Sequence, residues 1–355
     1  MLDSAFWASQ RVFLTGHTGF KGSWTAFWLG RLGADVSGYA LAPETVPDLY
    51  SILHPGSGVR STFGDILDIP SLTAAIAASN PTVAIHMAAQ PLVRYSYREP
   101  ARTFATNVTG TLNVLEALRR APNLKAVLVI TTDKVYRNDD SGHAFTEGDP
   151  LGGHDPYSSS KAACEEVVSC YRQSFYADMG VKLATARAGN VVGGGDWSED
   201  RLVPDLWRAL QTGEEVVLRN PLSTRPWQHV LDPVFGYLLY TEKLAGEEGA
   251  NLPCALNFAP RPEQPLTVEA VTKIMAMRLH MAKGWRLAEG CQPVEMKLLQ
   301  LDASLAASTL GWRPRMTSRQ AMEWTADWYL AKHRGEDVRA LTARQLADYQ
   351  ELVGL

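Results

Sequence analysis

A chain of 355 residues is longer than one hydrophobic core usually supports, so we expect one large domain with a smaller one attached. Hydrophobic residues make up 46% and charged residues 20% of the chain, which is ordinary for a globular protein and excludes a disordered or membrane-embedded one. The formal net charge of -4 argues against general binding to nucleic acid or to a membrane surface.

Cysteine usage gives no sign of a metal site. Cys164, Cys170, Cys254 and Cys291 form neither a CxxC pair nor a Cys/His spacing typical of zinc. A chain of this length needs no disulfides, so we expect reduced thiols. The first residues are too few and too mixed for a signal peptide, and no apolar run reaches membrane-spanning length. The sequence therefore predicts a cytoplasmic protein with no metal and no membrane or nucleic-acid partner.

The N-terminal half alternates between short apolar runs and longer amphipathic stretches. Strands are predicted at residues 11–15, 35–41, 59–63, 83–87, 126–131 and 182–187. Helices are predicted up to residue 32, and over 68–80, 100–121 and 157–178. This alternation predicts an α/β fold with a doubly wound parallel sheet, and ligands beyond the carboxyl ends of its strands.

After residue 190 the alternation stops, and Gly-rich and Pro-rich loops with short helices follow. We interpret residues 9–190 as a Rossmann-like domain, with a returning segment near 225–260. Residues 191–355 are predicted to form a smaller, interleaved domain that mainly binds substrate.

A glycine-rich turn follows the first predicted strand, with Gly16, Gly19 and Gly22 spaced as G-x-x-G-x-x-G. Bare backbone and a helix N-terminus at this junction suit a pyrophosphate. A glycine turn without a ligand is the alternative, and the position after the first strand argues against it. Glu44 is a candidate ribose contact, and the absence of a nearby arginine favours NAD over NADP.

Tyr157 and Lys161 stand four residues apart on a predicted helix, so their side chains share a face. An ammonium beside a phenol favours the phenolate, which allows the tyrosine to act as a base at neutral pH. Taken alone, such a pair is more often an ordinary surface feature. Thr132, at the end of the preceding strand, completes a Thr-Tyr-Lys set that resembles the catalytic set of short-chain dehydrogenases.

Asp133 and Lys134 directly follow Thr132, at the carboxyl edge of the predicted sheet. Elimination of water from a hexose needs a further acid and base near C5 and C6, which these residues could provide. A solvated Asp-Lys turn is the alternative. A sugar epimerase needs only the Tyr/Thr pair and usually has small residues here.

Several segments together resemble the nucleotide-sugar 4,6-dehydratases of the extended short-chain dehydrogenase/reductase family, and among them the CDP-glucose branch. They are TGHTGFKGSW (15–24), AAQPLVRYSY (88–97), TTDKVY (131–136), GGHDPYSSSKAACE (152–165), RAGNVVGGGDW (187–197) and RNPLSTRPWQHVLDP (219–233). The likeness extends through LGWRPR at 310–315. The wider family has Asp-Glu where this chain has Asp133-Lys134, as the CDP-glucose branch does. The loop at 137–152 looks shorter than is usual in that branch.

The resemblance implies three groups of site residues. The catalytic residues would be Thr132, Asp133, Lys134, Tyr157 and Lys161. The NAD contacts would be Gly16, Gly19, Phe20, Gly22, Asp65, Ile66, Ala88, Ala89, Gln90, Asn107, Tyr157 and Lys161, with Asn107 also distorting its helix. The nucleotide sugar would be bound by Asn190, Arg201, Arg219, Arg225 and His229, because guanidinium groups suit phosphate oxygens.

Some of these residues also have a simpler local interpretation. Asp65 is equally a turn or cap residue, and each arginine is equally a partner in a surface ion pair. Packing explains His229 as well as binding does. His86, on an apolar strand, is expected in the core. The C-terminal aromatic residues are also expected there: Trp324, Trp328 and Tyr329.

The resemblance implies that the chain would be an NAD-dependent hydro-lyase that converts CDP-glucose to CDP-4-keto-6-deoxyglucose. It would oxidise C4, eliminate water across C5 and C6, and return the hydride to C6, so that NAD is regenerated. Two alternatives stay open: a 4,6-dehydratase or 4-epimerase for another nucleotide sugar, and a non-catalytic NAD-binding regulator on the same fold. A homodimer is expected, paired through the helices predicted at 100–121 and 157–178.

Overall fold

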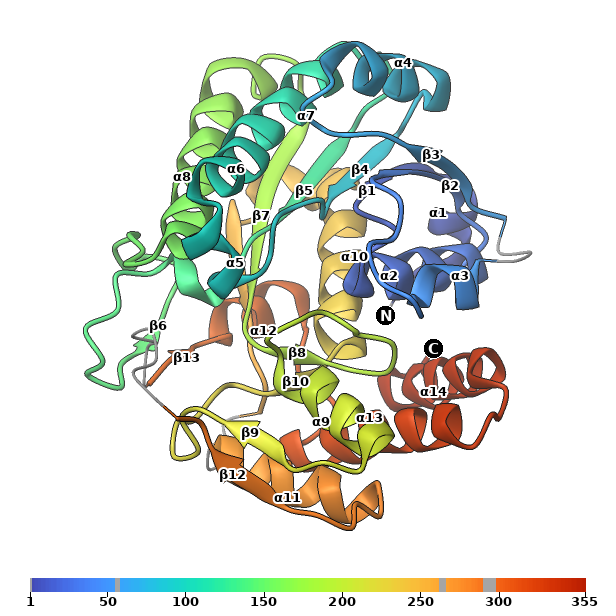
Figure 1. Cartoon of the computed structure of the whole chain (residues 1–355). Helices are drawn as coiled ribbons and strands as arrows, with labels where there is room; N and C mark the ends of the chain where they lie inside the picture. Colours follow the sequence, from blue (N-terminus) through green and yellow to red (C-terminus); the bar gives the residue numbers. More distant parts are fainter. Residues whose placement is uncertain (1, 55–57, 262–265, 290–297) are drawn as a thin grey trace.

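The computed structural model describes residues 2–54, 58–261, 266–289 and 298–355. Its centre is a seven-stranded parallel sheet with helices on both faces (Figure 1). The strand order is β11-β7-β5-β4-β1-β2-β3. The strands are β1 (Arg11–Thr15), β2 (Asp35–Ala40), β3 (Arg60–Phe63), β4 (Val83–His86), β5 (Ala126–Ile130), β7 (Lys182–Ala188) and β11 (Ala255–Phe258). The predicted doubly wound α/β fold is therefore confirmed.

The sheet is apolar at its centre because helices cover both faces. Every residue of β4 and β5 is buried, whereas every residue of the edge strand β3 is exposed. The predicted strand ends lie within one residue of the observed ones. β11 was not predicted as a separate strand. It lies in the returning segment and pairs in parallel with β7.

Two apolar layers pack against the sheet. One face carries α2 (Phe20–Arg31) and α10 (Leu231–Ala245). The opposite face carries α4 (Ile69–Ser79), α7 (Gly110–Leu118) and α8 (Pro156–Tyr171). The ends of α4 follow the predicted signals, because the Asp68 side chain accepts from the Ser71 N–H and Asn80 ends the helix at a φ of 43°.

The two long predicted helices each contain a π-helical turn, and the turn that includes Asn107 is the distortion expected at that residue. η1 (Ala105–Thr109) lies between α6 (Pro100–Phe104) and α7, and η3 (Arg172–Tyr176) follows α8. The apolar spacing still indicated one long helix in each case, since a single bulge shifts the helix face without ending the helix.

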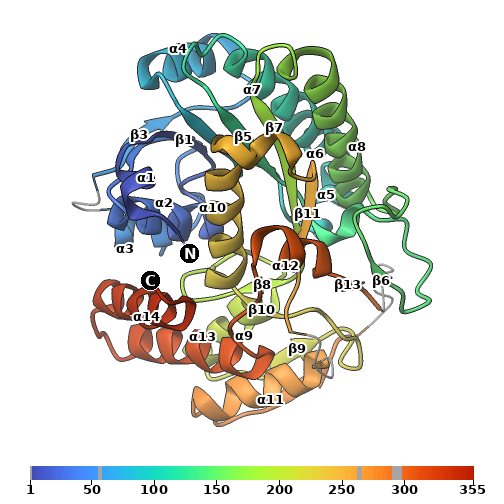
Figure 2. The ribbon, with the colours of Figure 1, turned by 180° about the vertical axis from the view of Figure 1, so that it is seen from behind.

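The elements that follow residue 190 build most of a smaller lobe beneath the sheet, here called the small lobe (Figures 1 and 2). Its helices are α9 (Leu202–Thr212), α11 (Val268–Arg278), α12 (Ser304–Leu310), α13 (Ser318–His333) and α14 (Val338–Val353). Its strands are β8 (Val191–Val192), β9 (Val216–Leu218), β10 (Gln228–His229), β12 (Trp285–Leu287) and β13 (Gln300–Leu301). The remaining elements are α1 (Ser4–Ala8), α3 (Leu49–Leu53), α5 (Val93–Arg98), β6 (Ala144–Phe145) and the 3-10 turns η2 (Asp133–Val135) and η4 (Glu247–Asn251).

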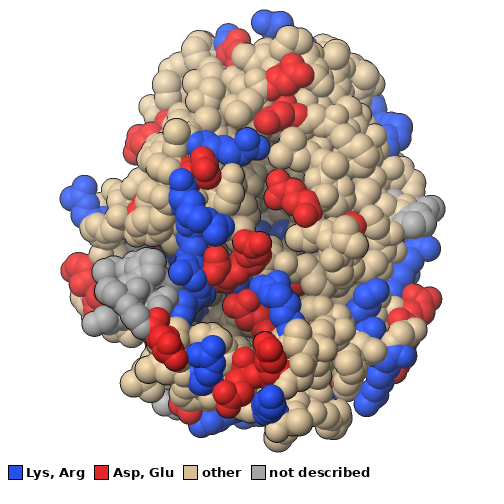
Figure 3. Space-filling view, viewed as in Figure 1, with Lys and Arg blue, Asp and Glu red and all other residues tan. Residues whose placement is uncertain are grey.

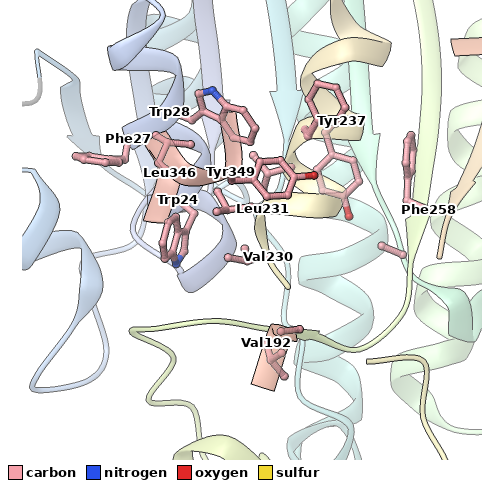
Figure 4. Close-up of a cluster of buried hydrophobic side chains, with 14 of the residues drawn as sticks. Trp24, Phe27, Trp28, Val192, Val230, Leu231, Tyr237, Phe258, Leu346 and Tyr349 are labelled. Atoms are coloured by element: carbon pink, nitrogen blue, oxygen red, sulfur yellow. The ribbon is translucent and has the colours of Figure 1, made fainter. Parts of the chain in front are cut away.

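Aromatic packing holds the small lobe against the sheet. Tyr349 of α14 reaches toward α2 and α10 (Figure 4), and its ring lies edge-on to Trp28 with centroids 5.8 Å apart. Trp328 and Tyr329 are fully buried and Trp324 is partly buried against the same core, which confirms that the C-terminal aromatic residues belong to it. The small lobe and the helices on this face of the sheet therefore share one packed core.

Two smaller expectations concern membranes and thiols. Within the described ranges, no helix combines the length and the apolar character that crossing a membrane requires. Cys164, Cys170 and Cys254 are free thiols, as expected. Cys291 lies outside the described residues.

Candidate active site

A cavity of about 280 Å³ lies beyond the carboxyl ends of the central strands, between the sheet and the small lobe. Figure 3 shows this hollow in the front face, bordered by acidic and basic side chains. Of the residues predicted from the sequence, the cavity is lined by Phe20, Thr132, Asp133, Lys134, Tyr157, Asn190, Arg201, Arg219 and Arg225.

The inner end of the cavity joins the turn after β5 to the first turn of α8. Thr132 caps the turn η2, where its hydroxyl accepts from the Lys134 N–H. Tyr157 is the second residue of α8, which begins after an Asp155 capping box with Pro156 in its first position. Lys161 lies one turn further on, and its Nζ donates to the Ile130 carbonyl at 3.1 Å.

Two opposing effects act on the pKa of Tyr157. Burial raises the pKa of Tyr157 to about 12, although a hydrogen bond with Thr132 and the charge of Arg201 pull it down. Lys161 is not among the groups that shift the pKa of Tyr157 here, so the expectation that a neighbouring lysine favours the phenolate stays a prediction. The Lys161 ammonium is directed to the Ile130 carbonyl, and burial lowers the pKa of Lys161 as well.

Asp133 is the most buried carboxyl group that reaches the cavity, with 2% exposure. Its Oδ1 accepts from the Thr132 hydroxyl at 3.0 Å, whereas Oδ2 has no hydrogen-bond partner among the described residues. Burial raises the pKa of Asp133, while the charge of Lys134 lowers it. A carboxyl group in this setting holds its proton to a higher pH than usual and is suited to donate it.

The glycine turn fits a pyrophosphate. Helix α2 begins at Phe20, and its N-cap residue, Gly19, has no side chain to cap it, so the N–H groups of its first turn stay available. A Cβ atom at Gly22 would lie 2.0 Å from the Gly16 carbonyl oxygen, so only glycine allows the turn to close. A Cβ at Gly19 would meet only that oxygen, at 3.4 Å, which leaves the outer side of the turn open to a ligand.

The other predicted cofactor residues follow β3 and β4, except Asn107, which lies in η1 and contacts the segment after β4. Asn107, 1% exposed, sits in η1 and exchanges hydrogen bonds with the Gln90 backbone at 2.8 and 3.1 Å. Its Nδ2 also donates to Ser160 of α8. Asn107 therefore supports the segment that includes Ala88, Ala89 and Gln90. Asp65 accepts from the Leu67 N–H, as a turn residue does, and Ile66 is buried.

Two of the predicted phosphate-binding arginines are already paired with aspartates. Arg201 contacts Asp196 at 2.9 Å. Arg219 contacts the Asp200 carboxylate at 3.2 Å and donates to the Asp200 carbonyl at 3.1 Å. Arg225 is 8% exposed and donates to the Thr224 carbonyl. All three arginines reach the cavity, but an incoming phosphate would compete with a carboxylate for two of them.

The expectation that His229 binds substrate is wrong. His229 is fully buried and does not line the cavity. Its ring packs edge-on to Trp24 and Trp324, with centroids 6.0 and 5.7 Å away. Burial lowers the pKa of His229 to about 3, so the ring is neutral. Arg225 and Trp227 of the same segment line the cavity, whereas the His229 side chain joins the core.

His86 is a core residue, as predicted. It is 2% exposed, and its two ring nitrogens contact the hydroxyls of Thr15 and Thr111 at 2.7 and 3.0 Å.

The structure adds residues that were not predicted. Lys21 lines the cavity, and burial together with the charges of Lys161 and Arg201 lowers the pKa of Lys21 to about 7. The Lys21 Nζ lies 6.0 Å from the ring centroid of Tyr237, whose hydroxyl has no hydrogen-bond partner among the described residues. The only sequence signal for Lys21 was its place inside the glycine turn.

This fold and site define an NAD-dependent enzyme of the short-chain dehydrogenase type. The model of the NAD dependent epimerase/dehydratase family matches residues 12–253. The chain belongs to that family, and the predicted cofactor, NAD, is confirmed.

Similar proteins include both dehydratases and epimerases. The CDP-glucose 4,6-dehydratase of Salmonella typhimurium is 45% identical over 354 residues, which are 98% of each chain. The dTDP-glucose 4,6-dehydratase 1 of Escherichia coli is 25% identical over 92% of this chain and 95% of its own. The structure of a Thermotoga maritima UDP-glucose 4-epimerase with UDP-glucose has a TM-score of 0.78 and 24% identity, over 91% of this chain and 99% of the epimerase, and it shows the shared fold.

Proposed function

We propose that the protein is a CDP-glucose 4,6-dehydratase, a hydro-lyase that forms CDP-4-keto-6-deoxyglucose. The observation that carries the proposal is the buried carboxyl group of Asp133, next to Lys134 and hydrogen-bonded to Thr132 at the inner end of the cavity. The similarity to the Salmonella enzyme along nearly the whole chain supports the choice of nucleotide.

In this proposal Tyr157 takes the proton of the C4 hydroxyl, while Thr132 positions the Tyr157 hydroxyl and the C4 hydroxyl. Bound NAD supplies a reversible two-electron oxidant and is regenerated within the cycle. Thr132 and Arg201 pull the pKa of Tyr157 down against burial, which is the direction that a base at C4 requires. Lys161, on the same face of α8, adds positive charge to this end of the site.

We assign the elimination step to Asp133 and Lys134. A ketone at C4 acidifies the proton on C5, so a modest base can remove it. Lys134 would accept this proton, and Asp133 would protonate the departing C6 hydroxyl. The raised pKa of Asp133 supports its role as the acid.

The remaining residues bind the two ligands in this proposal. Residues 9–190 would hold NAD, with the pyrophosphate at the glycine turn and the adenosine near Asp65 and Ile66. Residues 191–355 would mainly hold the nucleotide sugar, with the diphosphate near Asn190 and the three arginines at 201, 219 and 225. Exchange of the Asp200 carboxylate for a phosphate would release Arg219 to the substrate.

We also propose a cytoplasmic homodimer that pairs through α6, α7 and α8. The support is a set of exposed apolar side chains on the outer side of this helical layer. Phe104 is 40% and Leu112 is 37% exposed. Burial of such side chains against a second copy would remove them from water.

The reaction is tested with a panel of CDP-, UDP-, dTDP- and GDP-glucose, each incubated with the enzyme and NAD. Mass spectrometry should detect loss of water and a 4-keto product from CDP-glucose first. An isomer formed without loss of water would identify an epimerase instead. If no nucleotide sugar reacts, the regulator alternative stands.

A further inference from the structure

The cavity has an outer end that is apolar on its walls. The first turn of α9, the end of β9 and the start of α11 form it, through Val203, Pro204, Leu218 and Val268. Tyr157 and Asp133 reach the same cavity from α8 and from the turn after β5, so a nucleotide sugar that places its hexose against them would extend its base toward these walls of the small lobe. Flat apolar walls suit a nucleotide base, but they do not distinguish one base from another.

Besides Asp133, four carboxylates line the cavity: Asp196, Glu199, Asp200 and Asp205. Asp196 pairs with Arg201, and Glu199 pairs with Arg98. Asp200 is shared between Arg94 at 2.9 Å and Arg219 at 3.2 Å, so basic groups already engage it on two sides. Asp205, in the first turn of α9, contacts Arg208 at 2.6 Å through Oδ1. No hydrogen bond from another described residue reaches the carboxylate of Asp205.

Asp205 is partly withdrawn from water, with 33% of its side chain exposed. Burial raises the pKa of Asp205 even though Arg208 lowers it, so the carboxylate is incompletely solvated. A further hydrogen-bond donor at this place would offset that loss of solvation.

We propose that Asp205 reads the pairing edge of the nucleotide base and selects cytosine by accepting a hydrogen bond from its exocyclic amine. The proposal rests on the function proposed above. Cytosine presents an amine donor at C4, where uracil and thymine present a carbonyl acceptor. A carboxylate attracts the amine and repels the carbonyl, so one residue both favours the correct base and rejects the others.

Asp205→Asn tests this selection with little change of shape. Calorimetry with CDP and UDP gives the binding preference, and kcat/KM for CDP-glucose and UDP-glucose gives the catalytic preference. We expect both preferences for cytosine to fall by about 10- to 100-fold, because an amide can also donate to a carbonyl. The kcat at saturating CDP-glucose should stay near the wild-type value, since the catalytic residues are untouched. Asp205→Ser has the same expected result and serves if the asparagine variant folds poorly.

Two matched variants separate base recognition from a general effect of charge. Glu215→Gln removes the same charge from a neighbouring depression outside the cavity and should keep the cytosine preference. Arg208→Gln removes the ion-pair partner but leaves the carboxylate, and it should keep or increase the preference.

An unchanged preference in Asp205→Asn overturns the proposal, as does an equal loss in Glu215→Gln or Arg208→Gln. Failure of the wild type to dehydrate CDP-glucose would overturn the proposed function instead. The relative binding of CDP and UDP would still decide the role of Asp205.

Discussion

Burial acts on Tyr157 and Asp133 in the same direction but with opposite consequences. It raises the pKa of both groups, so both tend to keep their protons. For Asp133, the proposed acid, the raised pKa keeps the proton that it would donate. For Tyr157, the proposed base, the raised pKa makes loss of the proton harder, and Thr132 and Arg201 offset this effect in part.

Tyr157→Phe should lower turnover by about two to four orders of magnitude, because a positioned base is lost. NAD affinity should stay close to the wild-type value, since the glycine turn is unchanged. Steady-state kinetics and a fluorescence titration with NAD measure the two effects. Tyr171→Phe, on the same helix but outside the cavity, is the control. Nearly normal turnover in Tyr157→Phe would remove this residue from the mechanism.

Lys134→Ala should oxidise C4 but stop before the loss of water, so the absorbance of reduced cofactor accumulates on the enzyme. Lys134→Arg keeps the charge without a practical proton acceptor and should stall as well. In heavy water the wild type should place deuterium at C5 of the product, since the base exchanges its proton with solvent. Dehydration at the normal rate by Lys134→Ala would make the lysine structural and Asp133 the next candidate for the base.

Asp133→Asn should raise the melting temperature at pH 8 relative to the wild type, and change it much less at pH 4. The pKa of Asp133 is higher in the folded chain than the ordinary value of 3.8. The folded state therefore binds more protons than the unfolded state between these pKa values, and wild-type stability falls as pH rises through them. Thermal scans at both pH values measure this, and an equal shift at both would show that ionisation of Asp133 does not affect stability.

At the scale of elements, a buried ion pair connects α8 to the sheet beneath the site. Arg187 of β7 and Glu165 of α8 are both 5% exposed and lie 2.9 Å apart. Thr131, just after β5, donates to Glu165 at 2.6 Å. Glu165 thus links the helix that carries Tyr157 to the segment just before the turn that carries Asp133.

Glu165→Ala should lower the free energy of unfolding by about 3–5 kcal/mol, because it leaves the Arg187 charge buried without its partner. Denaturant titration measures the loss. Glu166→Ala changes an exposed neighbour on the same helix and should have little effect. A loss below 1 kcal/mol, a threshold set well under the range for buried pairs, would contradict this account.

The elements of the fold were predictable because their causes are local, whereas the catalytic roles of Thr132, Tyr157 and Lys161 stay predictions. The sequence predicts β5 as a strand because five successive apolar residues fit a strand that is covered on both faces. The bulge at Asn107 depends on its bonds to Gln90 and Ser160, which sequence spacing does not reveal. The positions of His229 and Asp200 likewise follow from how distant segments pack.

For the whole molecule, the proposed dimer makes a separate prediction. A double variant, Phe104→Asp with Leu112→Asp, should sediment as a monomer at concentrations where the wild type is a dimer, since charges would face the interface. Met277→Asp changes a residue that is 72% exposed on α11 and should leave the dimer intact. A dimeric double variant would show that another surface is used.

The place of β11 at the edge of the sheet constrains how the chain folds during synthesis. The chain leaves the sheet after β7, forms α9 and β9 of the small lobe, and returns with α10 and β11. A nascent chain that ends before residue 231 has no α10 to cover its face of the sheet and exposes the free edge of β7. The sheet is therefore completed only after α9 and β9 of the small lobe have emerged from the ribosome, and an interrupted chain would carry an aggregation-prone surface.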